Sequence, residues 1–122
     1  MMRVAYVNIF VTDLSRSVEF YRNLLGLDLQ FSSEEHGFAS FGAGGVRLGI
    51  ALPGSDHQEL VGRHTGVGIE VADLEAEHIR LSGLGVRFIM PPTNQAWGGF
   101  MALFADPDGN VFYLDQLKVD RS

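Results

Sequence analysis

The chain contains the same eight-residue pattern twice. Residues 7–14 read Val-Asn-Ile-Phe-Val-Thr-Asp-Leu and residues 67–74 read Val-Gly-Ile-Glu-Val-Ala-Asp-Leu, so that five of eight positions are identical at a separation of sixty. An internal repeat constrains the fold more than any single motif, because each copy must form the same unit of structure. The sequence therefore predicts two similar modules in tandem.

Each copy begins as a strand followed by a helix. Apolar residues alternate with other residues over 7–11 and 67–71, which is typical of a strand with one buried face. The aspartate near the end of each pattern is a suitable helix N-cap. Apolar residues then recur every three or four positions, which predicts helices over 14–25 and 74–84, each followed by a glycine.

Three further strands are expected in each copy. They lie over 27–31, 37–41 and 46–52 in the first copy, and over 86–90, 100–104 and 111–117 in the second. The segment Asp106-Pro107-Asp108-Gly109-Asn110 is typical of a hairpin turn. We therefore expect an α+β fold with two βαβββ modules, over residues 4–52 and 66–117, and a linker over 53–65. A module of about 50 residues buries too little surface to fold alone, so both belong to one domain over 1–122.

The composition excludes several classes of function. The chain has 122 residues, with 9 Lys+Arg against 15 Asp+Glu and a formal net charge of −6, which disfavours nucleic acid as a partner. It has no cysteine, which excludes disulfides, thiolate metal sites and a cysteine nucleophile. No apolar run approaches the ~20 residues that span a bilayer, and the N-terminus lacks the features of a signal peptide. We expect a cytoplasmic protein with no membrane partner.

The two faces of the predicted strands differ in chemistry. One face is apolar and suits packing against helices; it carries Val7, Ile9, Val11, Leu48, Ile50, Leu52, Val67, Ile69, Val71, Phe112 and Leu114. The other face is mixed and carries Tyr6, Asn8, Phe10, Arg47, Gly49, Ala51, Gly66, Gly68, Glu70, Val111, Tyr113 and Asp115. Aromatic, polar and glycine residues on one face are typical of a ligand cavity, although a solvated outer face has a similar pattern.

With these residues the chain resembles the vicinal-oxygen-chelate superfamily, the fold of glyoxalases, bleomycin resistance proteins and extradiol dioxygenases. The segments that carry the resemblance are VNIFVTDLSRSVEFYRNLLGLDL, VGIEVADLEAEHIRLSGLGVRF and FADPDGNVFYL, and it extends over roughly residues 4–117. The resemblance implies that two βαβββ modules form a curved mixed sheet around a central cavity. It does not fix the reaction, because the superfamily supports many chemistries.

The resemblance also implies four positions at which metal-using members place their ligands. In this sequence those positions hold Tyr6, Gly49, Gly66 and Tyr113. A divalent metal needs at least three nitrogen or oxygen ligands, glycine has no side chain, and a neutral tyrosine is a poor ligand. We therefore expect no metal and no cofactor. One route to a metal site stays open, since a two-residue slip of the strand would bring His64 near the position of Gly66.

The segment from Pro91 to Phe100 is similar to a stretch of bleomycin-resistance-like members, which bind or sequester a planar aromatic compound. Trp97, the only tryptophan, falls there beside Gly98 and Gly99. It can lie over a flat ligand, or it can be a lid that packs on the end of the sheet.

The sequence favours a metal-independent binder of a small planar aromatic compound, anionic or polar, of the resistance or sequestration type. We expect its site to consist of Tyr6, Asn8, Phe10, Arg47, Gly49, Gly66, Gly68, Trp97, Tyr113 and Asp115. Arg47 supplies a fixed cation for an anionic group.

The alternative is an enzyme of the same superfamily, a lyase, isomerase or dioxygenase. It would use a displaced metal site, or proton transfer by Glu70, Asp115, Tyr6 or Tyr113. Glu70 or Asp115 can equally pair with Arg47. In either case we expect a homodimer, because the strands that carry four phenylalanines would otherwise leave an exposed apolar patch; these are Phe38, Phe41, Phe100 and Phe104.

Overall fold

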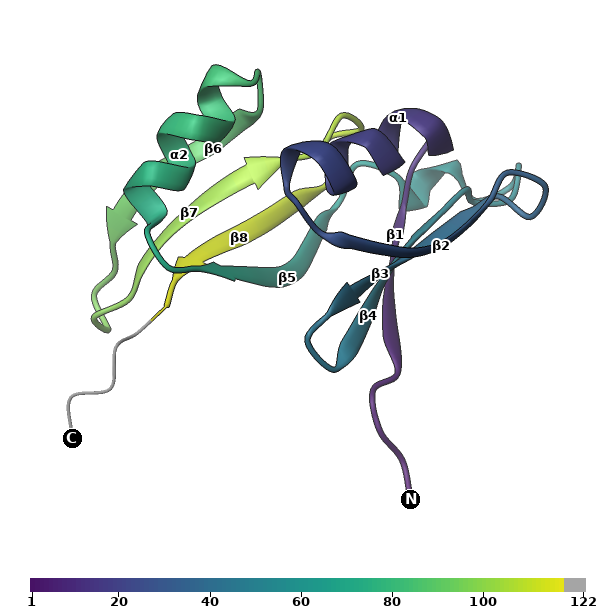
Figure 1. Ribbon diagram of the computed structural model, residues 1–122, viewed down its shortest axis with the longest axis horizontal. Coiled ribbons are helices and arrows are strands. Elements are labelled where there is room, and N and C mark those ends of the chain that lie inside the picture. Colours follow the sequence, from purple (N-terminus) through teal and green to yellow (C-terminus); the bar gives the residue numbers. More distant parts are fainter. Residues whose placement is uncertain (118–122) are drawn as a thin grey trace. The chain divides into compact units, whose positions relative to one another are not determined.

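The computed structural model describes residues 1–117, which form two compact units (Figure 1). Unit 1 comprises residues 1–63 together with 107–110, and unit 2 comprises residues 64–106 together with those from 111 onward. Each unit contains one four-stranded sheet and a helical segment that packs on it.

The elements of unit 1 follow the predicted βαβββ order. They are β1 (Tyr6–Phe10), α1 (Leu14–Glu19), η1 (Phe20–Leu24), β2 (Asp28–Ser33), β3 (Phe38–Ala43) and β4 (Val46–Ala51), followed by the short helix η2 (Gln58–Leu60). The strand order is β1-β4-β3-β2. The pair β1–β4 is parallel and the other pairs are antiparallel.

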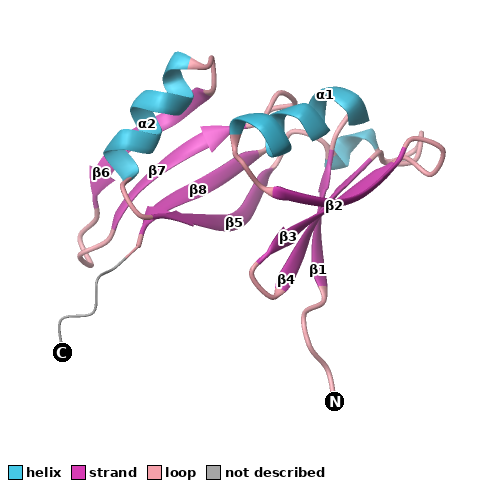
Figure 2. Cartoon of the chain, viewed as in Figure 1, coloured by secondary structure: helices cyan, strands magenta, loops and turns pink. Residues whose placement is uncertain are grey.

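Unit 2 repeats this topology. Its elements are β5 (His64–Val71), α2 (Leu74–Gly83), β6 (Arg87–Asn94), β7 (Phe100–Ala105) and β8 (Val111–Gln116), with the strand order β5-β8-β7-β6. Here too the outer pair β5–β8 is parallel and the others are antiparallel. The α+β fold class and the repeat of two βαβββ modules are thus confirmed (Figure 2).

The ends of the helices follow the sequence signals. Asp13 Oδ1 accepts a hydrogen bond from the backbone N–H of Arg16, and Asp73 Oδ1 accepts one from Ala76, each at 3.1 Å. These carboxylates satisfy N–H groups that have no partner within the helix. Gly26 and Gly85, with φ of 77° and 90°, take the left-handed conformation beyond each helix.

The first helical segment has about the predicted length, but only its first half is an α-helix. Its second half, η1, is a π-helix, in which the N–H of Leu25 donates to the carbonyl of Phe20 at 3.1 Å. The wider turn places two successive aromatic residues in the core, because Phe20 and Tyr21 are both buried with their rings edge to face at 5.2 Å. In the second module, α2 ends at Gly83, and Leu84 is exposed rather than part of the buried face.

The alternation of strand faces agrees with burial in most positions. Ile9, Ile50 and Leu114 are buried, whereas Tyr6 and Asn8 are exposed. Leu52 was expected on the apolar face, but it lies beyond the end of β4 and is 42% exposed.

The expected patch of four phenylalanines is only partly present. Phe41 and Phe104 are fully buried, because their positions place them on the apolar face of their strands. Phe38 is exposed and Phe100 is half-buried. The exposed apolar surface of the described strands is therefore smaller than the sequence predicts.

The hairpin turn lies where the sequence predicts it, between the antiparallel strands β7 and β8, whereas the linker is shorter than expected. β5 begins at His64, inside the expected linker 53–65, which itself contains η2. The turn at 107–110 belongs to unit 1, where Asn110 Oδ1 accepts from the N–H groups of Gly62 and Arg63 at 2.8 and 3.2 Å. Asn110 Nδ2 donates to the carbonyl of Phe10 at 2.9 Å. The buried asparagine thus holds three backbone groups at once.

In the part of the chain that the structure covers, residues 1–117, no helix combines the length and the apolar character needed to cross a membrane.

Candidate ligand-binding site

A hollow of about 250 Å³ lies on the sheet of unit 1, and we call it hollow 1. It is lined by Tyr6, Asn8, Phe38, Ala39, Ser40, Arg47 and Gly49. The register explains this grouping, because Gly49 of β4 lies between its Cα partners Asn8 of β1 and Ser40 of β3. Tyr6 and Arg47 are also Cα partners. Each lies two residues before Asn8 or Gly49 in its strand, and therefore on the same face of the sheet. Hollow 1 therefore lies on the mixed face of the sheet.

Gly49 lets the carboxamide of Asn8 lie flat in the floor of hollow 1. A Cβ atom built on Gly49 would overlap Asn8 Oδ1 and would lie 3.3 Å from Asn8 Cγ. The carboxamide of Asn8 therefore lies directly over the backbone of β4, in the space that any other residue at position 49 would fill. This carboxamide makes no side-chain hydrogen bond to the described residues of unit 1, so its donor and acceptor are free for a ligand.

Arg47 provides the positive charge of hollow 1. Its backbone N–H donates to the carbonyl of Ala5 at 3.2 Å, and its side chain is exposed. Within the described residues of unit 1, no carboxylate lies within ion-pair distance of its guanidinium. Glu70 and Asp115 belong to unit 2, so the expected pairing of either with Arg47 stays a prediction.

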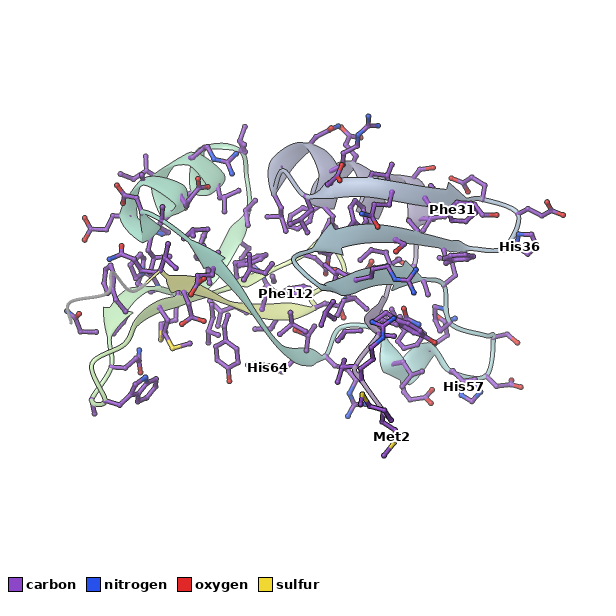
Figure 3. All side chains as sticks on the ribbon, turned by 60° about the horizontal axis from the view of Figure 1, so that its bottom comes forward. Met2, Phe31, His36, His57, His64 and Phe112 are labelled. Carbon is purple, nitrogen blue, oxygen red and sulfur yellow. The ribbon has the colours of Figure 1, made fainter. Side chains whose placement is uncertain are left out.

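Aromatic side chains border the floor of hollow 1. Tyr6 stands beside Arg47 and is 56% exposed. Toward the outer strands, Phe38 is 40% exposed, and its ring lies 5.3 Å from that of Phe31 on β2 (Figure 3). Phe31 is the Cα partner of Ser40. Phe31, Phe38 and Ser40 are not among the site residues expected from the sequence, although extending the alternation to β3 places positions 38 and 40 on this face.

A second hollow, of about 550 Å³, lies in unit 2, and we call it hollow 2. It is lined by Gly68, Glu70, Trp97, Gly99, Phe100, Asp115, Gln116 and Leu117. Glu70 and Asp115 are Cα partners on β5 and β8. Trp97 is 70% exposed, and its indole lies over Gly99, where a Cβ would be 2.7 Å from Nε1.

The predicted site residues are thus distributed over both units. Hollow 1 contains Tyr6, Asn8, Arg47 and Gly49, and hollow 2 contains Gly68, Trp97 and Asp115. The described lining of the two hollows does not include Phe10, Gly66 or Tyr113.

Strand β5 contains a two-residue shift in register, which the sequence analysis left as a possibility. His64 pairs with Val111 and Gly68 with Tyr113, so β5 has two residues more than β8 over this stretch. Gly66, with a φ of 72°, lies in the bulge, and its N–H donates to His64 Nδ1 at 3.1 Å. The imidazole lies 4.9 Å from the ring of Tyr113 (Figure 3). His64 thus takes the register position that unbroken pairing would give to Gly66.

The positions that correspond to family metal ligands do not fit a metal in either unit. In unit 1 the space above Gly49 is filled by the carboxamide of Asn8. In unit 2 the shift in register places one imidazole, that of His64, beside Tyr113. Gly66 has no side chain that could provide a second ligand. Among residues 1–117, no group of three or more His, Cys, Asp or Glu side chains could hold a metal ion.

Comparison with known proteins identifies the family. Residues 3–114 match the Glyoxalase/Bleomycin resistance protein/Dioxygenase superfamily. The chain belongs to this superfamily, as the repeat and the two βαβββ units indicate. A similar curated protein is the uncharacterized protein YraH of Bacillus subtilis (strain 168), which is 26% identical over 93% of this chain and 97% of YraH.

Two solved structures illustrate the fold. A member of the same superfamily from Sphaerobacter thermophilus DSM 20745 has a TM-score of 0.82 and 27% identity, over 96% of this chain and 98% of that one. TnmS3 from Streptomyces sp. CB03234, described as an antibiotic binding protein, has a TM-score of 0.76 and 28% identity, over 97% and 98% of the two chains.

Proposed function

We propose that the protein binds a small planar aromatic anion in hollow 1, without a metal, in a resistance or sequestration role. The observation that carries this proposal is the guanidinium of Arg47, which has no carboxylate within ion-pair distance among the described residues of unit 1, beside the floor that Asn8 forms over Gly49. A cation next to a flat, partly apolar surface is complementary to an aromatic ring with an anionic substituent.

Each side chain of hollow 1 has a role in this binding. Arg47 donates two parallel hydrogen bonds to a carboxylate, or one to a phenolate. The ring of the ligand lies on the carboxamide of Asn8, which covers Gly49, and contacts Phe38 in an offset or edge arrangement. Asn8 donates to or accepts from a further polar substituent. The volume of about 250 Å³ is below the ~300–1,000 Å³ of typical drug-sized sites, which favours a compound of one or two rings.

Two further points support the proposal. The similarity to TnmS3, an antibiotic binding protein, agrees with a binding role on this fold. The lack of convergent ligands at Gly49 and Gly66 agrees with binding that needs no metal. Action in the cytoplasm and assembly as a homodimer belong to the same proposal and come from the sequence.

Calorimetric titration with 2-naphthoate and its neutral analogue 2-naphthamide tests the proposal. We expect Arg47→Ala to weaken naphthoate binding by ~1.5–3 kcal/mol, the scale of a hydrogen bond to a charged group, and to change naphthamide binding much less. Arg87→Ala is the matched control, because Arg87 is an exposed arginine of β6 and lines neither hollow. Equal loss of both ligands in Arg47→Ala, or equal effects of the two arginine variants on naphthoate, would refute the role of Arg47.

A further inference from the structure

We propose that unit 2 carries a second and independent binding site, hollow 2, for an organic cation with an apolar body, such as an arylalkyl ammonium. Hollow 2 combines a cavity of about 550 Å³, an exposed tryptophan face and two carboxylates that have no Lys, Arg or His within ion-pair distance in the part of unit 2 that the structure describes. Its charge is opposite to that of hollow 1, so this site goes beyond the proposed function.

The two carboxylates of hollow 2 are neighbours in the sheet. Glu70 and Asp115 are Cα partners on the parallel strands β5 and β8, which brings them to one face about 4.7–4.9 Å apart in backbone spacing. Like charges side by side on a sheet are unfavourable unless a cation lies between or above them. Among the described residues of unit 2, neither carboxylate has a Lys, Arg or His within ion-pair distance.

Gly68 directs one of these carboxylates into the cavity. Asp115 Oδ2 lies 3.2 Å from the place that a Cβ on Gly68 would occupy. The carboxylate of Asp115 therefore extends over β5 next to Glu70, in space that a side chain at position 68 would take.

Trp97 forms the aromatic side of hollow 2. Its loop is fixed by two backbone hydrogen bonds, from Gln95 N–H to the carbonyl of Gly99 at 2.7 Å and from Gly98 N–H to the carbonyl of Gln95 at 2.9 Å. The indole lies over Gly99 and is 70% exposed, so it borders the cavity rather than packing in the core. The face of a tryptophan is the strongest aromatic attractor of cations among side chains.

The rest of the lining sets the character of the ligand. Phe100 and Leu117 add apolar surface. Gln116 is already engaged, because its Oε1 accepts from the N–H of Leu74 at the start of α2 at 3.1 Å. The charged groups among the described lining of hollow 2 are thus the two carboxylates, which favours a ligand with a positive charge attached to an apolar group. The volume lies within the range of typical small-molecule sites.

Titration with benzyltrimethylammonium tests this site. Trp97 is the only tryptophan, so its fluorescence reports on hollow 2, and calorimetry gives the affinity independently. We expect saturable binding that is weakened at least about tenfold in the double variant Glu70→Gln with Asp115→Asn, and also in Trp97→Leu measured by calorimetry. The matched control is Glu35→Gln with Asp56→Asn, which removes the same charge from exposed positions outside both hollows.

The outcomes separate this site from hollow 1. Unchanged benzyltrimethylammonium binding in Arg47→Ala supports an independent site, whatever that variant does to naphthoate. Equal affinity of the double variant and its control, quenching no greater than that of free N-acetyltryptophanamide, or displacement of the probe by millimolar Ca²⁺ would overturn the assignment to an organic cation. Trp97→Leu lies in a surface loop, so its result stands even if the double variant fails to fold.

Discussion

The substitution Gly49→Ala tests the flat floor of hollow 1. A methyl group at position 49 would overlap Asn8 Oδ1. The atom in the way is the end of a rotatable side chain, so we expect the carboxamide of Asn8 to turn away and the strand to stay in place. The backbone of Val7, at 3.6 Å from the new Cβ, is at an ordinary contact distance.

The effect on stability should therefore be small. Replacing a glycine within a strand by alanine stabilises the folded state by ~0.5–1 kcal/mol, through the lower entropy of the unfolded chain. Moving Asn8 off its preferred rotamer costs ~0.5–1.5 kcal/mol. These contributions nearly cancel, and we expect the free energy of unfolding to change by less than ~1 kcal/mol.

Binding should be affected much more than stability. The methyl group takes the place of the Asn8 carboxamide in the floor, and the displaced amide occupies space inside hollow 1. We expect the affinity for 2-naphthoate to fall about tenfold, equivalent to ~1.4 kcal/mol. Adding Asn8→Ala to Gly49→Ala should remove the overlap but not the methyl, and so should restore affinity only in part.

Calorimetry with 2-naphthoate and urea unfolding of the same samples measure both effects. Gly54→Ala is the control, since its Cβ would lie 3.6 Å from His57 Cδ2 in an exposed loop outside hollow 1. Unchanged affinity in Gly49→Ala would refute the flat floor. A loss of stability above ~3 kcal/mol would show that position 49 is constrained by the backbone, contrary to the reasoning above.

Asn110→Ala should lower the free energy of unfolding by about 3 kcal/mol in urea titrations, because it leaves three backbone groups without their side-chain partner; a loss below ~1 kcal/mol would contradict this. Asp73→Ala should cost about 1 kcal/mol through loss of the α2 cap, whereas the exposed Asp56→Ala should cost nothing measurable. Purified protein should be a dimer by light scattering at micromolar concentration, and a monomer would contradict this. It should contain far less than one equivalent of divalent metal by elemental analysis, and a stoichiometric metal would contradict that expectation.

The sequence was sufficient for the order of helices and strands, because the repeat determines it. The pattern at 7–14 and 67–74 gives both modules their first strand, their N-cap and the start of their helix. The alternation of residues also predicted the exposed side of β1, since the period of a strand leaves no other face for Tyr6 and Asn8.

Other features depend on contacts that a sequence pattern does not contain. The π-helix η1 depends on how Phe20 and Tyr21 pack, and apolar spacing cannot separate it from an α-helix. The turn that ends at Asn110 forms the predicted hairpin, but the pattern does not show that its asparagine also accepts hydrogen bonds from the N–H groups of Gly62 and Arg63. The grouping of predicted site residues within each hollow depends on strand register, which pairs Gly49 with Asn8 in unit 1 and Glu70 with Asp115 in unit 2.

The most direct test of the account is a titration of the isotopically labelled protein with 2-naphthoate, followed by amide NMR shifts. If hollow 1 is the anion site, saturable shifts will centre on β1, β3 and β4, with Asn8, Ser40 and Gly49 among the largest, and will be lost in Arg47→Ala. Shifts confined to the residues of hollow 2, or equal shifts in wild type and Arg47→Ala, would contradict the assignment of hollow 1 as the anion site.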